Sequence, residues 1–133
     1  MENIYWLNPD SRKFLQRGYL LPGETPEIRI DEIAKKAEEY LKIDGFATKF
    51  VEYMHKGFYS LSSPIWSNFG RERGLPISCF GSYIPDDMEK ILTKISEVGT
   101  MSKVGGGTSA YFGDVRSRGT AISTGGTSSG VHH

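Results

Sequence analysis

Residues that could take part in catalysis or ligand binding are concentrated in the second half of the 133-residue sequence. Cys79 is the single cysteine and could act as a redox thiol. Asp86 could accept a hydrogen bond from a ribose hydroxyl, as the acidic residue of dinucleotide sites does. The glycine-rich run 103–109 could present backbone N–H groups to an anion, and Arg116 and Arg118 are of the type that binds phosphate through paired hydrogen bonds. Each of these residues also has a structural interpretation.

For Cys79, the structural interpretation is an inert core residue. It lies in the apolar run 75–80, and no adjacent residue supplies the base or positive charge that forms a thiolate. Asp86 and Glu89 have the spacing of a capping box, so Asp86 is also a candidate helix N-cap, and both roles could coexist. The run 103–109 lacks the Gly-Lys-Ser/Thr ending of a P-loop, which leaves a tight turn and a ligand-approach site as equal alternatives.

Arginines in polar stretches are more often solvated than functional, and that alternative stays open for Arg116 and Arg118. Of the three histidines, His55 falls on an expected helix, and His132 and His133 end the sequence. A single cysteine cannot build a Cys-rich metal site, so no metal site is predicted.

Charge and hydropathy exclude several classes of protein. Sixteen Lys and Arg balance sixteen Asp and Glu, which argues against a general binder of nucleic-acid polymers, because phosphate contacts need surplus basic residues. No apolar run approaches the roughly 20 residues that span a bilayer, and the N-terminus carries Glu2 in place of a basic signal region. We therefore expect a cytoplasmic protein without a membrane partner, whose lone thiol needs a second thiol from another source for any redox work.

Helical patterns dominate the first 57 residues. A short helix is expected from Pro9 to Gly18, with Asn8 as its N-cap. A second helix opens at 25–26, and a third follows 44–45 and ends near residue 57. The apolar residues of the second helix keep the i, i+3, i+4 spacing of an amphipathic helix. They are Ile30, Ile33, Ala34, Ala37 and Leu41.

The pattern changes after residue 60. The run 75–80 predicts a buried strand after an edge proline, continuing toward residue 83, and 85–89 open a further helix. That helix has the apolar stripe Met88, Ile91, Leu92 and Ile95. Twelve of the sixteen glycines lie between residues 70 and 130, and the stretch after Gly99 could pass for a flexible linker. The apolar patch 110–112 favours short strands with functional loops, and hence an α/β fold.

Six segments in this order resemble the large, catalytic subunit of class I ribonucleotide reductase, most closely its bacterial and T4-type phage forms. They are YWLNPDSRKFLQRGYL at 5–20, SSPIW at 62–66, ISCF at 77–80, DDMEKI at 86–91, SKVGGGT at 102–108 and GGTSSG at 125–130. The resemblance covers nearly the whole chain. It implies an N-terminal helical domain at 1–60, followed at 61–133 by the first strands and helices of a ten-stranded α/β barrel.

The resemblance also implies roles for residues around the substrate. Cys79 matches the first-strand cysteine that reduces the ribose 2′ position together with a second, distant cysteine. Ser63 and Ser78 match residues that hold the nucleoside diphosphate substrate. Gly107 falls in the glycine loop whose backbone approaches that substrate. This overturns the inert interpretation of Cys79.

Two further residues match the family's allosteric site. Asp86 corresponds to the acid that binds the sugar of a deoxynucleotide effector, and Arg116 to a basic residue of the loop that holds effector phosphates. Effectors of the family are deoxynucleoside triphosphates and ATP. Because that site lies at a subunit contact, the helix that 85–89 open is a candidate dimer surface, and we expect a homo-oligomer.

The resemblance implies partners rather than a cofactor bound directly by this chain. These are the remaining C-terminal part of the large subunit, a small subunit whose dimetal centre supplies the radical, and a reductant of the thioredoxin or glutaredoxin type. The family's other cysteines have no counterpart here, so we expect one piece of a divided or truncated large subunit that is inactive alone. An uncovered strand edge would leave it oligomeric, partner-bound or partly disordered after Gly99.

Two alternatives stay open. The first is a non-catalytic, truncated paralogue that binds deoxynucleotides or a reductase subunit and regulates it. The second is another enzyme with the same barrel, such as a glycyl-radical enzyme, whose signatures would lie downstream.

Overall fold

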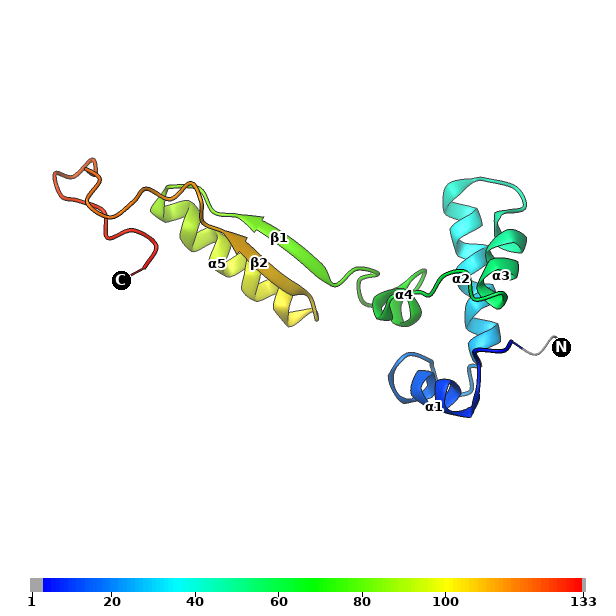
Figure 1. The fold of residues 1–133 in the computed structure, drawn as a ribbon. Helices are drawn as coiled ribbons and strands as arrows, with labels where there is room; N and C mark the ends of the chain where they lie inside the picture. The colour runs from blue at the N-terminus through cyan, green and yellow to red at the C-terminus, as the bar shows by residue number, and fades with distance from the viewer. Residues whose placement is uncertain (1–3, 133) are drawn as a thin grey trace. The chain divides into compact units, whose positions relative to one another are not determined.

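The computed structural model describes residues 4–132, and the chain forms two compact units (Figure 1). The first is Met1–Ile77 and is helical; the second is Ser78–His133 and contains two parallel strands. Helices followed by parallel strands confirm the predicted α/β class. The units divide between Ile77 and Ser78, and the domain division expected after residue 60 stays a prediction.

Helix α1, Pro9–Gly18, forms where its capping residues predict it. The Asn8 side chain accepts a hydrogen bond from the Ser11 N–H at 2.9 Å, and Pro9 supplies a first-turn φ that is already helical. At the other end, the Tyr19 N–H donates to the Leu15 carbonyl. The predicted helix is confirmed at both ends.

Helix α2, Pro26–Leu41, is capped by Thr25, whose hydroxyl accepts from the Ile28 N–H at 3.2 Å. It ends at Lys42, which adopts the left-handed conformation with φ 55°. The predicted stripe is buried in its first half and half-buried at Ala37, whereas Leu41 is exposed, contrary to its place in that stripe. The buried members are Ile30, Ile33 and Ala34.

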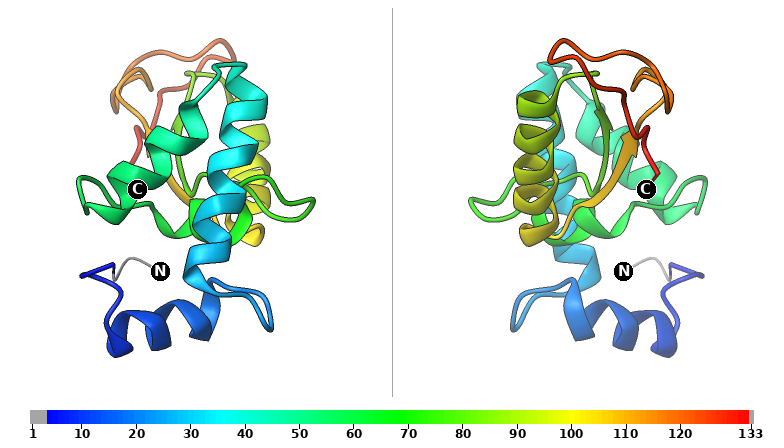
Figure 2. Two further views of the ribbon diagram at one scale, coloured as in Figure 1. Left: turned by 90° about the vertical axis from the view of Figure 1, so that its right-hand side faces the viewer. Right: turned by 90° about the vertical axis from the view of Figure 1, so that its left-hand side faces the viewer.

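Helices α3, Phe46–His55, and α4, Ser63–Asn68, complete the first unit. Helix α3 lies beside α2 and ends at His55, two residues before the predicted stop (Figure 2). Helix α4 was not anticipated, because a run rich in serine with a proline is more typical of a loop than of a helix. Residues from all these helices and the N-terminal segment form one core cluster. Its buried members are Ile4, Leu7, Leu15, Ile30, Met54 and Trp66.

The second unit is a βαβ arrangement of β1, Cys79–Tyr83, helix α5, Met88–Lys103, and β2, Gly107–Tyr111. The strands are parallel, Cys79 opposite Gly107 and Tyr83 opposite Tyr111. Helix α5 runs along the strand pair and contacts both strands (Figures 1 and 2). Strand β1 begins at Cys79, so the prediction of a strand from residue 75 is wrong at its start. Its residues alternate between exposed and half-buried, so the prediction of a buried strand is also corrected.

Two further expectations for α5 are corrected. Its N-cap is Asp87, whose side chain accepts from the Lys90 N–H at 3.0 Å, so Asp86 does not cap the helix. The predicted apolar stripe is largely exposed, at 68% for Met88, 58% for Leu92 and 63% for Ile95. Within the predicted stripe, Ile91 is half-buried, and the apolar residues Val98 and Met101 further along α5 are half-buried as well. Periodicity identified apolar positions but could not tell which of them are covered.

Beyond β2 the chain folds into hydrogen-bonded turns, in agreement with short strands and loops. Ala121 and Thr127 form an antiparallel bridge, and the Ile122 N–H donates to the Gly126 carbonyl at 3.0 Å. Over the part of the chain that the structure describes, no helix has the length and apolar character to cross a membrane.

Ile28 and Ile30, two of the three isoleucines of α2, offer a matched test of the core. Ile30 is fully buried, whereas Ile28 is 57% exposed. We expect Ile30→Ala to lower the free energy of unfolding by about 2–5 kcal/mol, because it opens a cavity in the packed cluster. Ile28→Ala should cost less than about 1 kcal/mol. Denaturant unfolding of both variants measures the difference, and equal losses would contradict the assigned core.

Candidate functional site

The carboxyl ends of β1 and β2 bring Asp86 and Arg116 together. Asp86 Oδ2 accepts from Arg116 Nε at 2.6 Å, and Asp86 Oδ1 accepts from the Arg116 backbone N–H at 3.2 Å. Arg116 Nη1 also donates to the Ala121 carbonyl at 3.3 Å. Both side chains are about one-third exposed, so the pair is open to solvent. The two predicted effector-binding residues are therefore direct neighbours.

A second polar link at this end was not predicted from the sequence. The Tyr83 hydroxyl donates to Asp114 Oδ2 at 2.7 Å, and the Tyr83 ring stacks on Tyr111 with centroids 6.4 Å apart. The hydrogen bond to Asp114 raises the pKa of Tyr83 above its usual value, with desolvation contributing in the same direction. The register that pairs Tyr83 with Tyr111 produces this contact, and no local motif could have revealed it.

The ion pair with Arg116 stabilises the ionised form of Asp86. Hydrogen bonds from the Arg116 side chain and backbone hold the pKa of Asp86 below its ordinary value. The carboxylate is therefore ionised at neutral pH and accepts hydrogen bonds only, as binding of a sugar hydroxyl requires. Arg116 keeps further N–H donors of the kind that bind phosphate oxygens.

At the amino ends of the strands, Cys79 lies opposite Gly107. The Cys79 thiol is exposed, with Sγ 3.9 Å from the Ser78 hydroxyl. The Ser78 carbonyl accepts from the Gly107 N–H at 2.5 Å. Three residues predicted from the resemblance thus meet at one place. Two of them, Cys79 and Gly107, line an open hollow of about 400 Å³ together with Phe80, Gly81, Thr108 and Ser109.

The glycine run forms the tight connection from α5 to β2. Gly105 has a φ of 90°, which favours glycine, and a Cβ on Gly106 would come within 2.6 Å of the Phe80 ring. The N–H groups of Gly105, Gly106 and Gly107 donate to the carbonyls of Ser102, Met101 and Ser78. These three donors are engaged within the chain, so the turn interpretation is favoured over an open anion nest.

Ser63 belongs to the first unit and begins α4. Its hydroxyl is exposed and donates to the Tyr19 hydroxyl at 3.3 Å. A hydroxyl with one long, exposed hydrogen bond can exchange that partner for a ligand oxygen at little cost.

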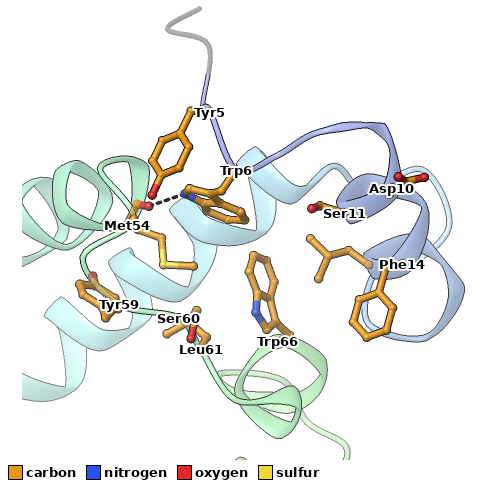
Figure 3. Close-up of a pocket in the computed structure, with 12 residues that line it drawn as sticks. Tyr5, Trp6, Asp10, Ser11, Phe14, Met54, Tyr59, Ser60, Leu61 and Trp66 are labelled. Atoms are coloured by element: carbon orange, nitrogen blue, oxygen red, sulfur yellow. Dashed lines mark hydrogen bonds between the residues drawn. The ribbon is translucent and has the colours of Figure 1, made fainter.

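The first unit also holds a larger apolar hollow of about 720 Å³ (Figure 3). Trp66 of α4 lies within it, and Trp6 lines it while donating its indole N–H to the Met54 carbonyl at 2.9 Å. None of the residues that the sequence singled out for chemistry is among the described residues that line this hollow.

Over residues 4–132, no three His, Cys, Asp or Glu side chains come together as a metal ion would need. His55 ends α3, and Arg118 lies in the turn region after β2, where its backbone borders Gly130. Neither residue joins the groups described above.

Residues 77–133 match the family described as "Ribonucleotide reductase, barrel domain". The first matched residue, Ile77, directly precedes the second compact unit. The matched part therefore contains β1, α5, β2 and both ends of the strand pair.

Longer relatives extend the similarity into the helical unit. The "Ribonucleoside-diphosphate reductase large subunit" of Invertebrate iridescent virus 6 is 34% identical over 102 residues, which are 76% of this chain and 10% of that protein. The protein of the same name from Invertebrate iridescent virus 3 is 40% identical over 97 residues, covering 70% of this chain and 15% of that one. The solved class Id ribonucleotide reductase alpha subunit of Actinobacillus ureae is 64% identical with a TM-score of 0.81, over 92% of this chain and 24% of that subunit.

The lowered pKa of Asp86 gives a prediction for the Asp86–Arg116 pair. Replacing the guanidinium, as in Arg116→Gln, should raise the pKa of Asp86 toward the ordinary value of about 3.9. Because the folded pKa lies below the unfolded one, the pair stabilises the fold above the unfolded pKa and loses that contribution as pH falls through the folded pKa. NMR titration of the Asp86 carboxyl measures the shift. Arg118→Gln is the control, and an equal shift in that variant would refute the assigned pairing.

Proposed function

This chain belongs to the ribonucleotide reductase large-subunit family, and from that membership we propose that it contributes a redox thiol and parts of two nucleotide sites to the reduction of ribonucleoside diphosphates. The observation that carries the proposal is the pairing of Cys79 with Gly107 at the start of the strands. An exposed thiol beside a position without a side chain leaves room for a sugar to approach the sulfur.

The proposed chemistry is a two-electron reduction of the ribose 2′ carbon. The C–O bond to the 2′ hydroxyl breaks, that oxygen leaves as water, and a C–H bond replaces it. Cys79 and a second cysteine from the rest of the large subunit supply two electrons and two protons as their thiols become a disulfide. An external dithiol of the thioredoxin or glutaredoxin type then reduces that disulfide.

Substrate contacts are proposed within each unit. Ser78 adjoins Cys79, and its hydroxyl is placed to donate to a ligand oxygen beside the thiol. Gly107 brings backbone close to the same hollow. In the helical unit, the exposed Ser63 hydroxyl is proposed to donate to the nucleoside diphosphate.

The opposite ends of the strands are proposed to bind an allosteric deoxynucleoside triphosphate or ATP. Asp86 supplies an ionised carboxylate for the effector sugar, and the neighbouring Arg116 guanidinium supplies positive charge for the phosphates. Their separation from Cys79 by the length of β1 keeps effector and substrate apart.

The partners proposed for this function follow from the family. They are the remaining part of the large subunit, a small subunit with a dimetal radical centre, and further copies of the large subunit. The similarity to a class Id alpha subunit supports the dimetal small subunit.

A regulatory binding module is the second candidate. It is favoured by one observation, namely that Asp86 and Arg116 both lie within the second compact unit and contact each other there. A chain of this size could therefore bind a deoxynucleotide without taking part in turnover.

Complementation tests the catalytic proposal. The chain is mixed with a polypeptide that carries the remaining barrel, the small subunit, an effector and a dithiol reductant. We expect ribonucleoside diphosphate reduction with the wild type and a loss of at least about 10³-fold with Cys79→Ser, because an alcohol cannot form the disulfide. Ala110→Ser on β2, which changes an exposed residue by one oxygen, should retain turnover. Undiminished turnover in Cys79→Ser would eliminate the proposed role.

Effector binding is tested on the chain alone by calorimetry with deoxynucleoside triphosphates. We expect Asp86→Asn to weaken binding by roughly tenfold or more, because the substitution removes a charged acceptor. Asp87→Asn keeps a capping side chain on α5 and should bind as the wild type does. Equal affinities in all three proteins would remove Asp86 from the site, and heat of binding without turnover in the complementation assay would favour the regulatory module.

A further inference from the structure

Arg29 is a charged residue in the core of the helical unit. It lies in the second turn of α2, and its side chain is fully buried. Burying a charge is costly unless it is paired and hydrogen-bonded, so a position of this kind requires a set of partners that repays the cost.

The partners of Arg29 are carbonyl groups of α4 and the residue that follows it. Arg29 Nε donates to the Trp66 carbonyl at 2.8 Å. Nη2 donates to the carbonyls of Ile65 at 3.1 Å and Phe69 at 2.8 Å. Nη1 is 2.8 Å from Glu32 Oε2 on the next turn of α2. One guanidinium therefore donates hydrogen bonds to three carbonyls and forms an ion pair with a carboxylate.

A second arginine supports the same helix end. Arg71 Nη1 donates to the Ser67 carbonyl at 3.0 Å, and Nη2 lies 2.6 and 2.7 Å from the two carboxylate oxygens of Glu24. The Glu24 side chain is only 9% exposed; desolvation acts to raise its pKa, but hydrogen bonds from Arg71 and the Leu21 N–H outweigh it and lower the pKa of Glu24. The carboxylate thus stays charged and holds Arg71 in place.

Helix α4 needs this support because it has only six residues. A helix that short is unstable on its own, and its last carbonyls lack intrahelical donors. Two guanidinium groups at the C-terminal end satisfy these carbonyls and complement the negative end of the helix dipole. With Trp66 buried in the core cluster, α4 is fixed to the longer α2 in both position and rotation.

We propose that Arg29 is a positioning residue for the substrate. Its hydrogen bonds to the carbonyls of α4 fix the position of that helix, and therefore the position of the Ser63 hydroxyl on the first residue of the helix. This inference rests on the proposed function, in which Ser63 contacts the nucleoside diphosphate. The planar fork of arginine reaches several carbonyls from one buried position, whereas the compact ammonium of lysine cannot span the same set.

The variant Arg29→Lys tests the inference in the complemented enzyme. We expect KM for the nucleoside diphosphate to rise by roughly tenfold with kcat within about twofold of the wild type, the pattern of lost ground-state binding. A merely stabilising residue would lower the amount of active enzyme, and hence the apparent kcat, and leave KM unchanged. An unchanged KM in Arg29→Lys would overturn the inference.

Arg12→Lys is the matched control in the same unit. Arg12 pairs with both carboxylate oxygens of Glu27 on α2 but forms no hydrogen bond or ion pair with α4 in the described chain. Its KM should equal that of the wild type, and a rise equal to that of Arg29→Lys would refute a specific role of Arg29. Arg71→Lys should raise KM less than Arg29→Lys, because it removes a single carbonyl contact.

Hydrogen exchange on the chain alone keeps the test decisive if Arg29→Lys fails to assemble. Exchange of the Phe69 N–H, which donates to Ile65, should quicken in the variant, while the Tyr19 N–H at the end of α1 keeps its rate. Unaltered exchange at Phe69 would overturn the inference. Lack of turnover by the wild-type assembly would overturn the proposed function and this inference with it, whereas wild-type turnover with an unchanged KM in the variant would overturn only the role of Arg29.

Discussion

The parallel pairing of β1 with β2 is the constraint on which both groups of candidate residues depend. Register places Cys79 beside Gly107 at one end, and Tyr83 beside Tyr111 at the other. Neither pair is near in sequence, and only the crossover through α5 brings the strands into contact. The Gly106 backbone packs where any side chain would strike Phe80, so the crossover closes on β1 at a fixed point.

The helical unit solves a different problem, which is to hold a very short helix in a defined place. Buried apolar side chains supply most of its cohesion, but they are not directional. Hydrogen bonds from Arg29 and Arg71 to the carbonyls of α4 supply the direction. In this unit, apolar burial therefore provides stability, and the arginine hydrogen bonds determine the position and orientation of α4.

Short sequence motifs correctly predicted the helix ends that depend only on neighbouring residues. Asn8 and Thr25 cap their helices as expected, since a cap depends on three or four consecutive residues. Asp86 and Asp87 both suit a cap, and the choice between them was settled by Arg116, which lies 30 residues away and takes Asp86. The exposed stripe of α5 and the existence of α4 likewise depend on what packs against each helix. The family resemblance, carried by short motifs in order, found the residues that pairing later brought together.

Strand β1 also determines how its two ends can influence each other. The four residue steps from Cys79 to Tyr83 separate these ends by roughly 13 Å. A parallel strand cannot slide past its neighbour by one residue without turning every side chain to the opposite face. Movement at one end of β1 is therefore transmitted to the other end by tilting or twisting of the strand pair as a rigid body. Cys79 and Tyr83 lie on the same face of the strand, so such a tilt would displace both side chains together.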